Sequence, residues 1–175
     1  NNGNSDEIID DLKKADGFIL RIGKIDRKAI EECPNLRVIT RPGVGVDNVD
    51  VKAATEHGIP VVICPAVNFH AVAEHTLTLI LALSKNLKES IEENQKGNFS
   101  IRSKYAATEV SGKTISVLGF GKIGKEVARL CKAIGMNICV FDPFIKAEQA
   151  TALGYKYKTD LLEAISEGDF VTLHM

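Results

Sequence analysis

The residues best suited to chemistry lie in residues 114–124, where an apolar stretch runs into the pattern G-x-G-x-x-G. Its glycines are Gly119, Gly121 and Gly124. Between a strand and a helix, the first glycine permits a tight turn, the second lets the backbone approach a pyrophosphate, and the third allows close packing of the helix on the strand. Free N–H groups of the first helical turn would then hold the anion. The pattern predicts a dinucleotide site.

An acidic residue stands where such a site needs one. Asp142 follows the apolar run 137–141 and lies 18 residues after Gly124, near the expected spacing of about 20. Its carboxylate would accept hydrogen bonds from the adenosine ribose, and it would repel a 2′-phosphate by on the order of 4 kcal/mol at a surface-like dielectric. Even when discounted, this repulsion favours NAD over NADP by about tenfold, although Lys146 is close enough in sequence to weaken it. The alternative is a chance glycine match in a loop, and the flanking strand, helix and acid argue against it.

A second glycine-containing loop, residues 41–48, directly follows the strand predicted over 36–40. Open α/β sheets bind ligands at the carboxyl ends of their strands. Gly43 and Gly45 would free the backbone to approach a small anion, and Arg41 would supply positive charge. Alternatively, the glycines only shape a turn, and Asn48 or Asp50 caps the helix predicted over 51–56. The residues alone leave both interpretations open.

The elements that must position these loops alternate along the chain. Buried-strand patterns occur at 17–21, 36–40, 58–64, 114–118, 137–141, 155–158 and 169–174. Helical patterns occur at 6–15, 26–33, 51–56, 68–93, 122–134, 146–153 and 160–166. This alternation predicts βαβ units, parallel sheets and an α/β fold.

The helix predicted over 68–93 is long for a compact domain, which suggests a connector that packs against the next domain or a partner subunit. Residues 95–112 are polar and rich in turn formers, so we expect a linker there. The expected organisation is a substrate domain portion with the connector helix at 1–94, a linker at 95–112, and the first half of an NAD-binding domain at 113–175.

Composition excludes several classes of protein. The 22 basic and 23 acidic residues nearly cancel and form no basic stripe, so no nucleic-acid partner is expected. No apolar run is long enough to span a membrane, and the polar start of the chain does not resemble a signal peptide. Four cysteines without C-x-x-C pairing indicate buried thiols in a reducing cytoplasm, and no metal site is predicted. His70 and His75 are five apart, so they do not share one metal-binding helix face.

Several motifs in register carry a family resemblance. They are the loop 41–50, Ala73-Glu74-His75, the turn 111–114, the glycine segment 119–124, and Asp142-Pro143. With them the chain resembles the D-isomer-specific 2-hydroxyacid dehydrogenases, particularly the D-3-phosphoglycerate dehydrogenase-like branch. The resemblance implies a partial flavodoxin-like substrate domain, joined by a long helix to a partial Rossmann-type NAD-binding domain. It also implies hydride transfer between NAD(H) and a small anionic 2-hydroxy or 2-keto acid, in a homodimer.

The resemblance also assigns roles to individual residues. Lys122 and Ile123 would bind the pyrophosphate through their backbone, Asp142 would bind the adenine ribose, and His174 and Met175 would begin a loop that touches the cofactor. The substrate and nicotinamide side would be lined by Arg41, Val44 and Gly45, with Arg21 at the position of a further arginine of the phosphoglycerate enzymes. An arginine at a strand end is also commonly a solvated surface charge, so both readings of Arg21 stay open.

No catalytic residue of the family falls within these 175 residues. The carboxylate-gripping arginine and the histidine–glutamate pair of the family lie beyond the matched positions. The expectation is therefore a portion of a longer enzyme that lacks turnover by itself. The alternatives are an NAD(H)-sensing, corepressor-like protein-binding module and a naturally truncated non-catalytic homologue.

Overall fold

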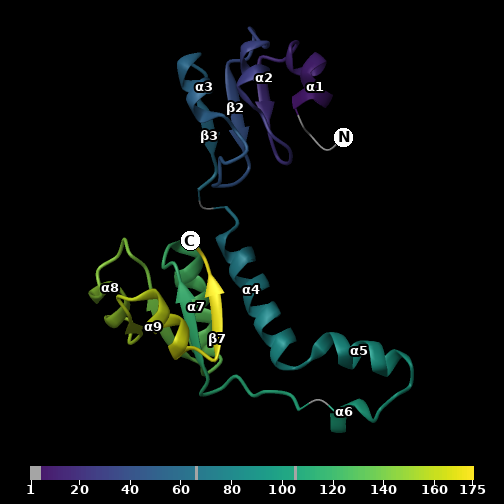
Figure 1. Ribbon diagram of the computed structural model, residues 1–175, viewed down its shortest axis with the longest axis vertical. Helices are drawn as coiled ribbons and strands as arrows, with labels where there is room; N and C mark the ends of the chain where they lie inside the picture. The colour runs from purple at the N-terminus through teal and green to yellow at the C-terminus, as the bar shows by residue number, and fades with distance from the viewer. Residues whose placement is uncertain (1–4, 66, 105) are drawn as a thin grey trace. The chain divides into compact units, whose positions relative to one another are not determined.

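The computed structural model describes residues 5–65, 67–104 and 106–175 (Figure 1). Its packing divides the chain into two compact units, with the division between Val67 and Asn68. The long predicted helix begins immediately after this division and packs with the second unit. The assignment of residues 1–94, 95–112 and 113–175 to substrate domain, linker and cofactor domain concerns function, and it stays a prediction.

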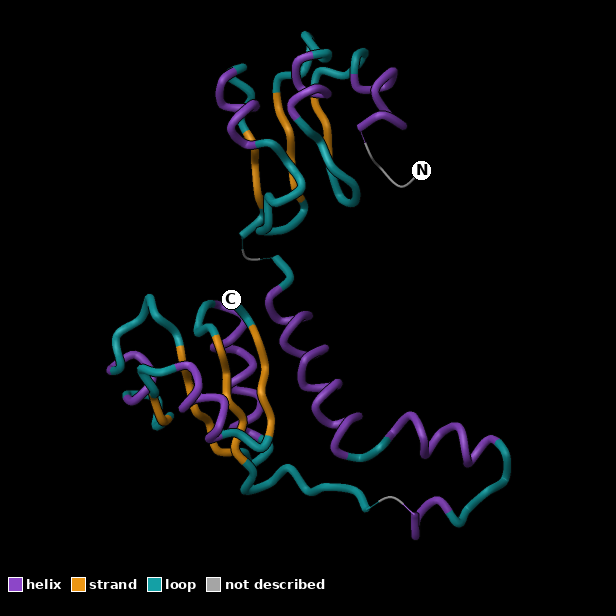
Figure 2. Tube along the Cα trace, in the orientation of Figure 1, coloured by secondary structure: helices purple, strands orange, loops and turns teal. Residues whose placement is uncertain are grey.

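The first unit is a three-stranded parallel sheet with the order β1-β2-β3 and its helices (Figure 2). Its elements are α1 (Ser5–Leu12), β1 (Gly17–Ile19), α2 (Arg27–Glu31), β2 (Val38–Arg41), α3 (Val51–Glu56) and β3 (Val61–Ile63). Leu20 and Ile39 are buried in a core shared with the helices, whereas Ile19 is 71% exposed on the other side of its strand. The alternation of buried and exposed residues follows the two-residue period of a strand.

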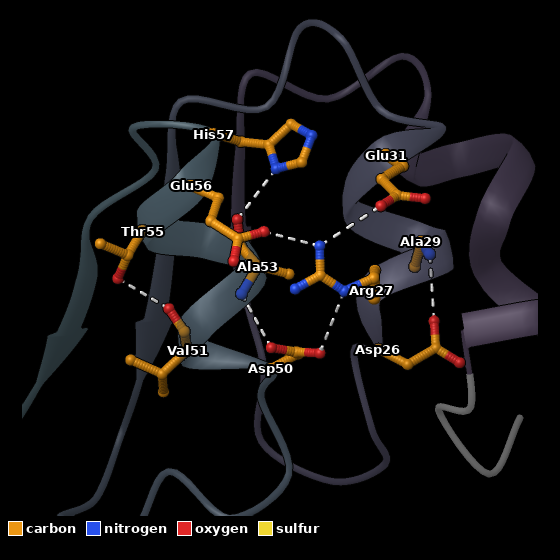
Figure 3. Close-up of polar contacts among 10 residues, drawn as sticks. All are labelled: Asp26, Arg27, Ala29, Glu31, Asp50, Val51, Ala53, Thr55, Glu56 and His57. Atoms are coloured by element: carbon orange, nitrogen blue, oxygen red, sulfur yellow. Dashed lines mark hydrogen bonds and ion pairs between the residues drawn. The ribbon is translucent and has the colours of Figure 1, made fainter.

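Local capping explains where the two short helices of this unit begin. Asp26 Oδ1 accepts from the N–H of Ala29 at 3.0 Å, and Asp50 Oδ1 accepts from the N–H of Ala53 at 2.8 Å. Arg27 then links the two helices through an ion pair of 2.7 Å between Nη1 and Glu56 Oε2 (Figure 3). Asp50, rather than Asn48, is therefore the cap of α3.

The second unit holds a four-stranded parallel sheet with the order β6-β5-β4-β7. Its elements are α4 (Phe69–Ser84), α5 (Leu87–Gln95), α6 (Ile101–Lys104), β4 (Thr114–Leu118), α7 (Lys122–Ala133), β5 (Asn137–Phe141), α8 (Glu148–Thr151), β6 (Lys156–Tyr157), α9 (Leu161–Glu167) and β7 (Phe170–Leu173). The predicted α/β class with parallel sheets is confirmed in both units. In this unit the strand order changes direction at β4, which is where such sheets bind ligands.

Both faces of the central strand β4 are buried, as expected for a parallel strand between helices. Ile115 and Val117 point into the core formed with α4 and α7, which contains Val127 and Cys131. Leu118, on the opposite face, packs in a second cluster with a residue of α9. This two-sided packing fixes the strand that leads into the glycine turn.

The helix predicted over 68–93 is interrupted. It forms α4 and α5, and Asn86 between them adopts a left-handed conformation with φ of 48°. The main-chain N–H of Thr108 donates to Ser84 O at 2.7 Å, and Lys85 Nζ donates to Thr108 O at 2.8 Å. The bond from Thr108 satisfies a carbonyl at the end of α4, and the bond from Lys85 holds the distant segment there. Asparagine tolerates the left-handed conformation that the break requires.

Candidate functional site

The glycine-rich turn begins where β4 ends. Gly119 has a φ of +95°, in the left-handed region that favours glycine, and its N–H donates to Phe141 O at 2.8 Å. A Cβ atom at Gly119 would lie 2.6 Å from both the carbonyl carbon and oxygen of His174. Steric exclusion and backbone conformation therefore both require glycine, and the turn brings Gly119 against the end of β7.

The other two glycines differ in what surrounds them. A Cβ atom at Gly124 would lie 2.0 Å from Gly119 O and 3.3 Å from Val117 Cγ1, so only glycine allows α7 to approach the turn this closely. A Cβ atom at Gly121 would have nothing within 4 Å. Packing inside the unit therefore does not explain Gly121, and its open surroundings leave the backbone accessible to a ligand.

The space beside Gly121 lies at the N-terminus of α7, which spans 12 residues. Lys122 and Ile123, the residues predicted to bind the pyrophosphate, are the first two residues of this helix. Helix N-termini favour anions because of their main-chain N–H groups and the helix dipole. The structure thus brings the predicted pyrophosphate-binding residues together beside this space, and their binding of a dinucleotide stays a prediction.

Asp142 lies at the end of β5 and is only 9% exposed. Its Oδ2 accepts from the N–H of Phe120 at 2.7 Å, and its Oδ1 accepts from the N–H of Phe144 at 2.8 Å. Each carboxylate oxygen can accept a further hydrogen bond, so these contacts are compatible with a ribose partner. Sequence reasoning missed the first bond, which ties the acid directly to the glycine turn.

His174 and Met175 complete this edge of the sheet. The N–H of His174 donates to Leu118 O at 2.7 Å, which extends the pairing of β7 with β4, and the His174 ring Nε2 lies 3.0 Å from Thr172 Oγ1. Burial lowers the pKa of His174 and so favours its neutral form near neutral pH. Both residues therefore lie beside Gly119, and their contact with a cofactor stays a prediction.

An ionic cluster joins α4 to α7 behind the turn. Glu126 accepts two hydrogen bonds from Arg129, at 2.8 and 3.0 Å, and its Oε1 lies 3.1 Å from His70 Nδ1. The bonds from Arg129 dominate in lowering the pKa of Glu126 to about 2, with a smaller contribution from His70. His70 thus makes a polar contact with a neighbouring helix. No group of three or more side chains that could hold a metal ion occurs among the described residues.

In the first unit, the residues predicted for the substrate side gather at the carboxyl ends of its strands. Arg41 is the last residue of β2, and its guanidinium donates to the carbonyl oxygens of Gly45, Leu20 and Arg21. Val44 is 54% exposed, and the side chain of Arg21 is also exposed. The structure therefore places all four predicted residues on one edge, where Arg41 contacts backbone.

The contacts of Asn48 at this edge were missed by sequence reasoning. Its Nδ2 donates to Gly23 O at 2.7 Å, and its main-chain oxygen accepts from the N–H of Ile25 at 2.9 Å. Asn48 therefore links the loop after β2 to the loop after β1. The only available signal was the tendency of asparagine to bond to backbone in loops, which does not reveal a partner 25 residues away.

These features define a class: parallel α/β units, with a glycine-rich turn at the point where strand order reverses, as in sheets that bind nucleotides. The model for the catalytic domain of the D-isomer specific 2-hydroxyacid dehydrogenases matches residues 2–172. The chain belongs to this family.

Three similar proteins illustrate the relationship. D-3-phosphoglycerate dehydrogenase of Methanocaldococcus jannaschii is 41% identical over 171 residues, which are 97% of this chain and 32% of that protein. D-lactate dehydrogenase of Aquifex aeolicus, solved with NAD and lactic acid, is 34% identical with a TM-score of 0.85, covering 95% of this chain and 50% of that one. An acyclic imino acid reductase, solved with NADPH and D-Arg, is 26% identical with a TM-score of 0.84, and the match covers 98% of this chain and 54% of that one. The chain thus spans about a third of the length of the first of these.

Within the described residues, no helix is both long and apolar enough to cross a membrane.

Proposed function

We propose that the complete protein is an NAD-dependent oxidoreductase that interconverts a D-2-hydroxy acid and its 2-keto acid, with D-3-phosphoglycerate or a related small acid as substrate. The observation that carries the proposal is the glycine turn. Gly119 and Gly124 are required by packing, whereas Gly121 borders open space at the start of α7. Family membership and the similarity to D-3-phosphoglycerate dehydrogenases support the reaction class and the substrate.

The chain would hold the cofactor through backbone and one carboxylate. Gly121, Lys122 and Ile123 would present N–H groups to the pyrophosphate, and Asp142 would accept from the ribose hydroxyls. When bound, the nicotinamide accepts or donates the hydride. Among similar proteins one was solved with NAD and another with NADPH. We favour NAD because the Asp142 carboxylate would repel a 2′-phosphate.

His174 and Met175 would border the cofactor beside Gly119. On the substrate side, Arg21, Val44 and Gly45 would face the anionic acid, and Arg41 would belong to the same edge. Proton transfer to or from the carbonyl oxygen needs a positioned acid or base, and we assign none among the described residues. We therefore propose that this chain binds cofactor without turnover. We also propose a cytoplasmic homodimer, on the four free thiols and the family resemblance.

Two measurements test the proposal. The first is a titration of the 175-residue chain with NADH and NADPH, followed by nicotinamide fluorescence, with NADH expected to bind more tightly. The second is an assay of the complete protein with NADH and hydroxypyruvate, pyruvate, glyoxylate or 3-phosphohydroxypyruvate. Binding of NADH without its oxidation by any 2-keto acid would contradict the proposed dehydrogenase activity and favour an NAD(H)-sensing module. Sedimentation of the complete protein as a monomer would contradict the homodimer.

A further inference from the structure

The side chain of Arg41 donates to three main-chain carbonyls of its own unit. Its Nε–H donates to Gly45 O at 3.0 Å, and its Nη1 donates to Leu20 O at 2.9 Å and to Arg21 O at 2.8 Å. A guanidinium has five N–H donors, and these bonds occupy the single donor of Nε and both donors of Nη1. Only the Nη2 group then remains for another partner.

This occupancy limits what Arg41 can do for a ligand. An arginine grips a carboxylate or phosphate with two parallel N–H donors on neighbouring nitrogens, and every such pair includes Nε or Nη1. The bonds to Leu20, Arg21 and Gly45 therefore occupy at least one donor of every such pair. In this geometry Arg41 cannot form the bidentate contact that would make it the main anion ligand.

The same bonds connect two loops at the carboxyl ends of the strands. Leu20 and Arg21 begin the loop after β1, whereas Gly45 lies in the loop after β2. Asn48 adds a second link between these loops, through its 2.7 Å bond to Gly23 O. The two residues hold the loops together at separate points along the edge.

We propose that Arg41 is a positioning residue, which holds the backbone that presents Arg21 and Gly45 to the substrate. This inference rests on the proposed function. A lysine could not replace Arg41, because its donors share one nitrogen and cannot reach the carbonyls on both loops as a planar fork does. Arg41 binds the carbonyl oxygen of Arg21 and so holds the backbone from which the exposed Arg21 side chain extends.

The test in the complete protein compares two substrates that differ by a phosphate. Arg41→Lys is expected to raise KM about tenfold for both hydroxypyruvate and 3-phosphohydroxypyruvate, because displaced loops weaken binding whatever the substrate charge. Arg21→Gln is expected to raise KM more for the phosphorylated substrate. A selective loss of the phosphorylated substrate in Arg41→Lys would overturn the proposal, as would an unchanged KM with only a smaller active fraction.

A measurement on the 175-residue chain separates this inference from the proposed function. The N–H groups of Ile25 and Cys64 donate to Asn48 O and Gly43 O, each at 2.9 Å, and so report on the loops. Arg41→Lys is expected to speed amide hydrogen exchange at both by about tenfold. The control is Arg37→Lys, in the exposed residue just before β2. Exchange at the wild-type rate in Arg41→Lys would overturn the inference, even if the complete protein proves active.

Discussion

The loops at the carboxyl end of β4 and at the carboxyl end of β2 place their candidate anion donors differently. At the end of β4 the proposed anion donors are main-chain N–H groups at the start of α7, beside the open space at Gly121. At the end of β2 the conspicuous cation, Arg41, directs its donors to the carbonyls of its own loops. A positive charge near a strand end is therefore weaker evidence of a ligand site than an unexplained glycine.

The difference follows from how each edge is supported. The glycine turn leads into α7, which spans 12 residues and buries Val127, Ala128 and Cys131 against the sheet. In the first unit, α2 and α3 span only 5 and 6 residues. These short helices bury only Ala29, Ile30, Ala53 and Ala54, and side-chain bonds from Arg41 and Asn48 to main-chain carbonyls also hold the loops.

The largest effect is expected where the cofactor edge is most tightly packed. Gly124→Ala should destabilise the chain by about 3 kcal/mol, because the new Cβ would lie 2.0 Å from Gly119 O and force the turn and α7 apart. Urea denaturation followed by circular dichroism measures the loss. A stability equal to that of the wild type would show that the close approach is not needed for the fold.

The Gly121→Ala variant is the matched control for Gly124→Ala. The new Cβ would have nothing within 4 Å, so stability should stay close to wild type. NADH affinity should nevertheless fall about thirtyfold, because the methyl group would occupy space needed by the pyrophosphate. Fluorescence titration measures this loss. If Gly121→Ala binds NADH normally, the open space is not the cofactor site.

Asp142→Asn tests the acid that links the turn to the ribose. The preference for NADH over NADPH should fall by about tenfold, because the repulsion of a 2′-phosphate is removed. The melting temperature without cofactor should also fall, since an amide has only one acceptor for the N–H groups of Phe120 and Phe144. Titrations with both cofactors and a thermal melt are needed. An unchanged preference would contradict the predicted ribose contact.

The smallest effect is expected from the ionic cluster behind the turn. The pKa of Glu126 is lowered from 4.5 to about 2, mainly by Arg129. The stabilising contribution of the ionised Glu126 carboxylate is therefore present above about pH 4.5 and is lost as the pH falls towards 2. Glu126→Gln should lower the melting temperature by a few degrees at most at neutral pH, and it should reduce the fall in melting temperature between pH 4.5 and 2. If the melting temperatures of variant and wild type fall equally between pH 4.5 and 2, the assignment of this fall to Glu126 is contradicted.

Much of the fold could be predicted because its signals are local. The strands β4 and β5 and the helix α3 follow from apolar runs and capping residues that lie within a few positions of one another. The break at Asn86 could not be predicted, because the helical pattern continues across it. The bonds that stabilise the end of α4 involve the main chain of Thr108, which is distant in sequence. The choice between Asn48 and Asp50 as cap was similarly open until the partner of Asn48, Gly23, was known.

The sequence by itself determined the alternation of strands and helices, the parallel α/β class, the glycine turn and the acid that follows it. These depend on residue types at short, regular spacings. Only the tertiary structure decided which glycines serve packing and which borders open space, that Asp142 binds the turn, and where the donors of Arg41 point. Hydrogen-bond partners and steric exclusion depend on atoms that folding brings together from distant positions, and residue spacing carries no record of them.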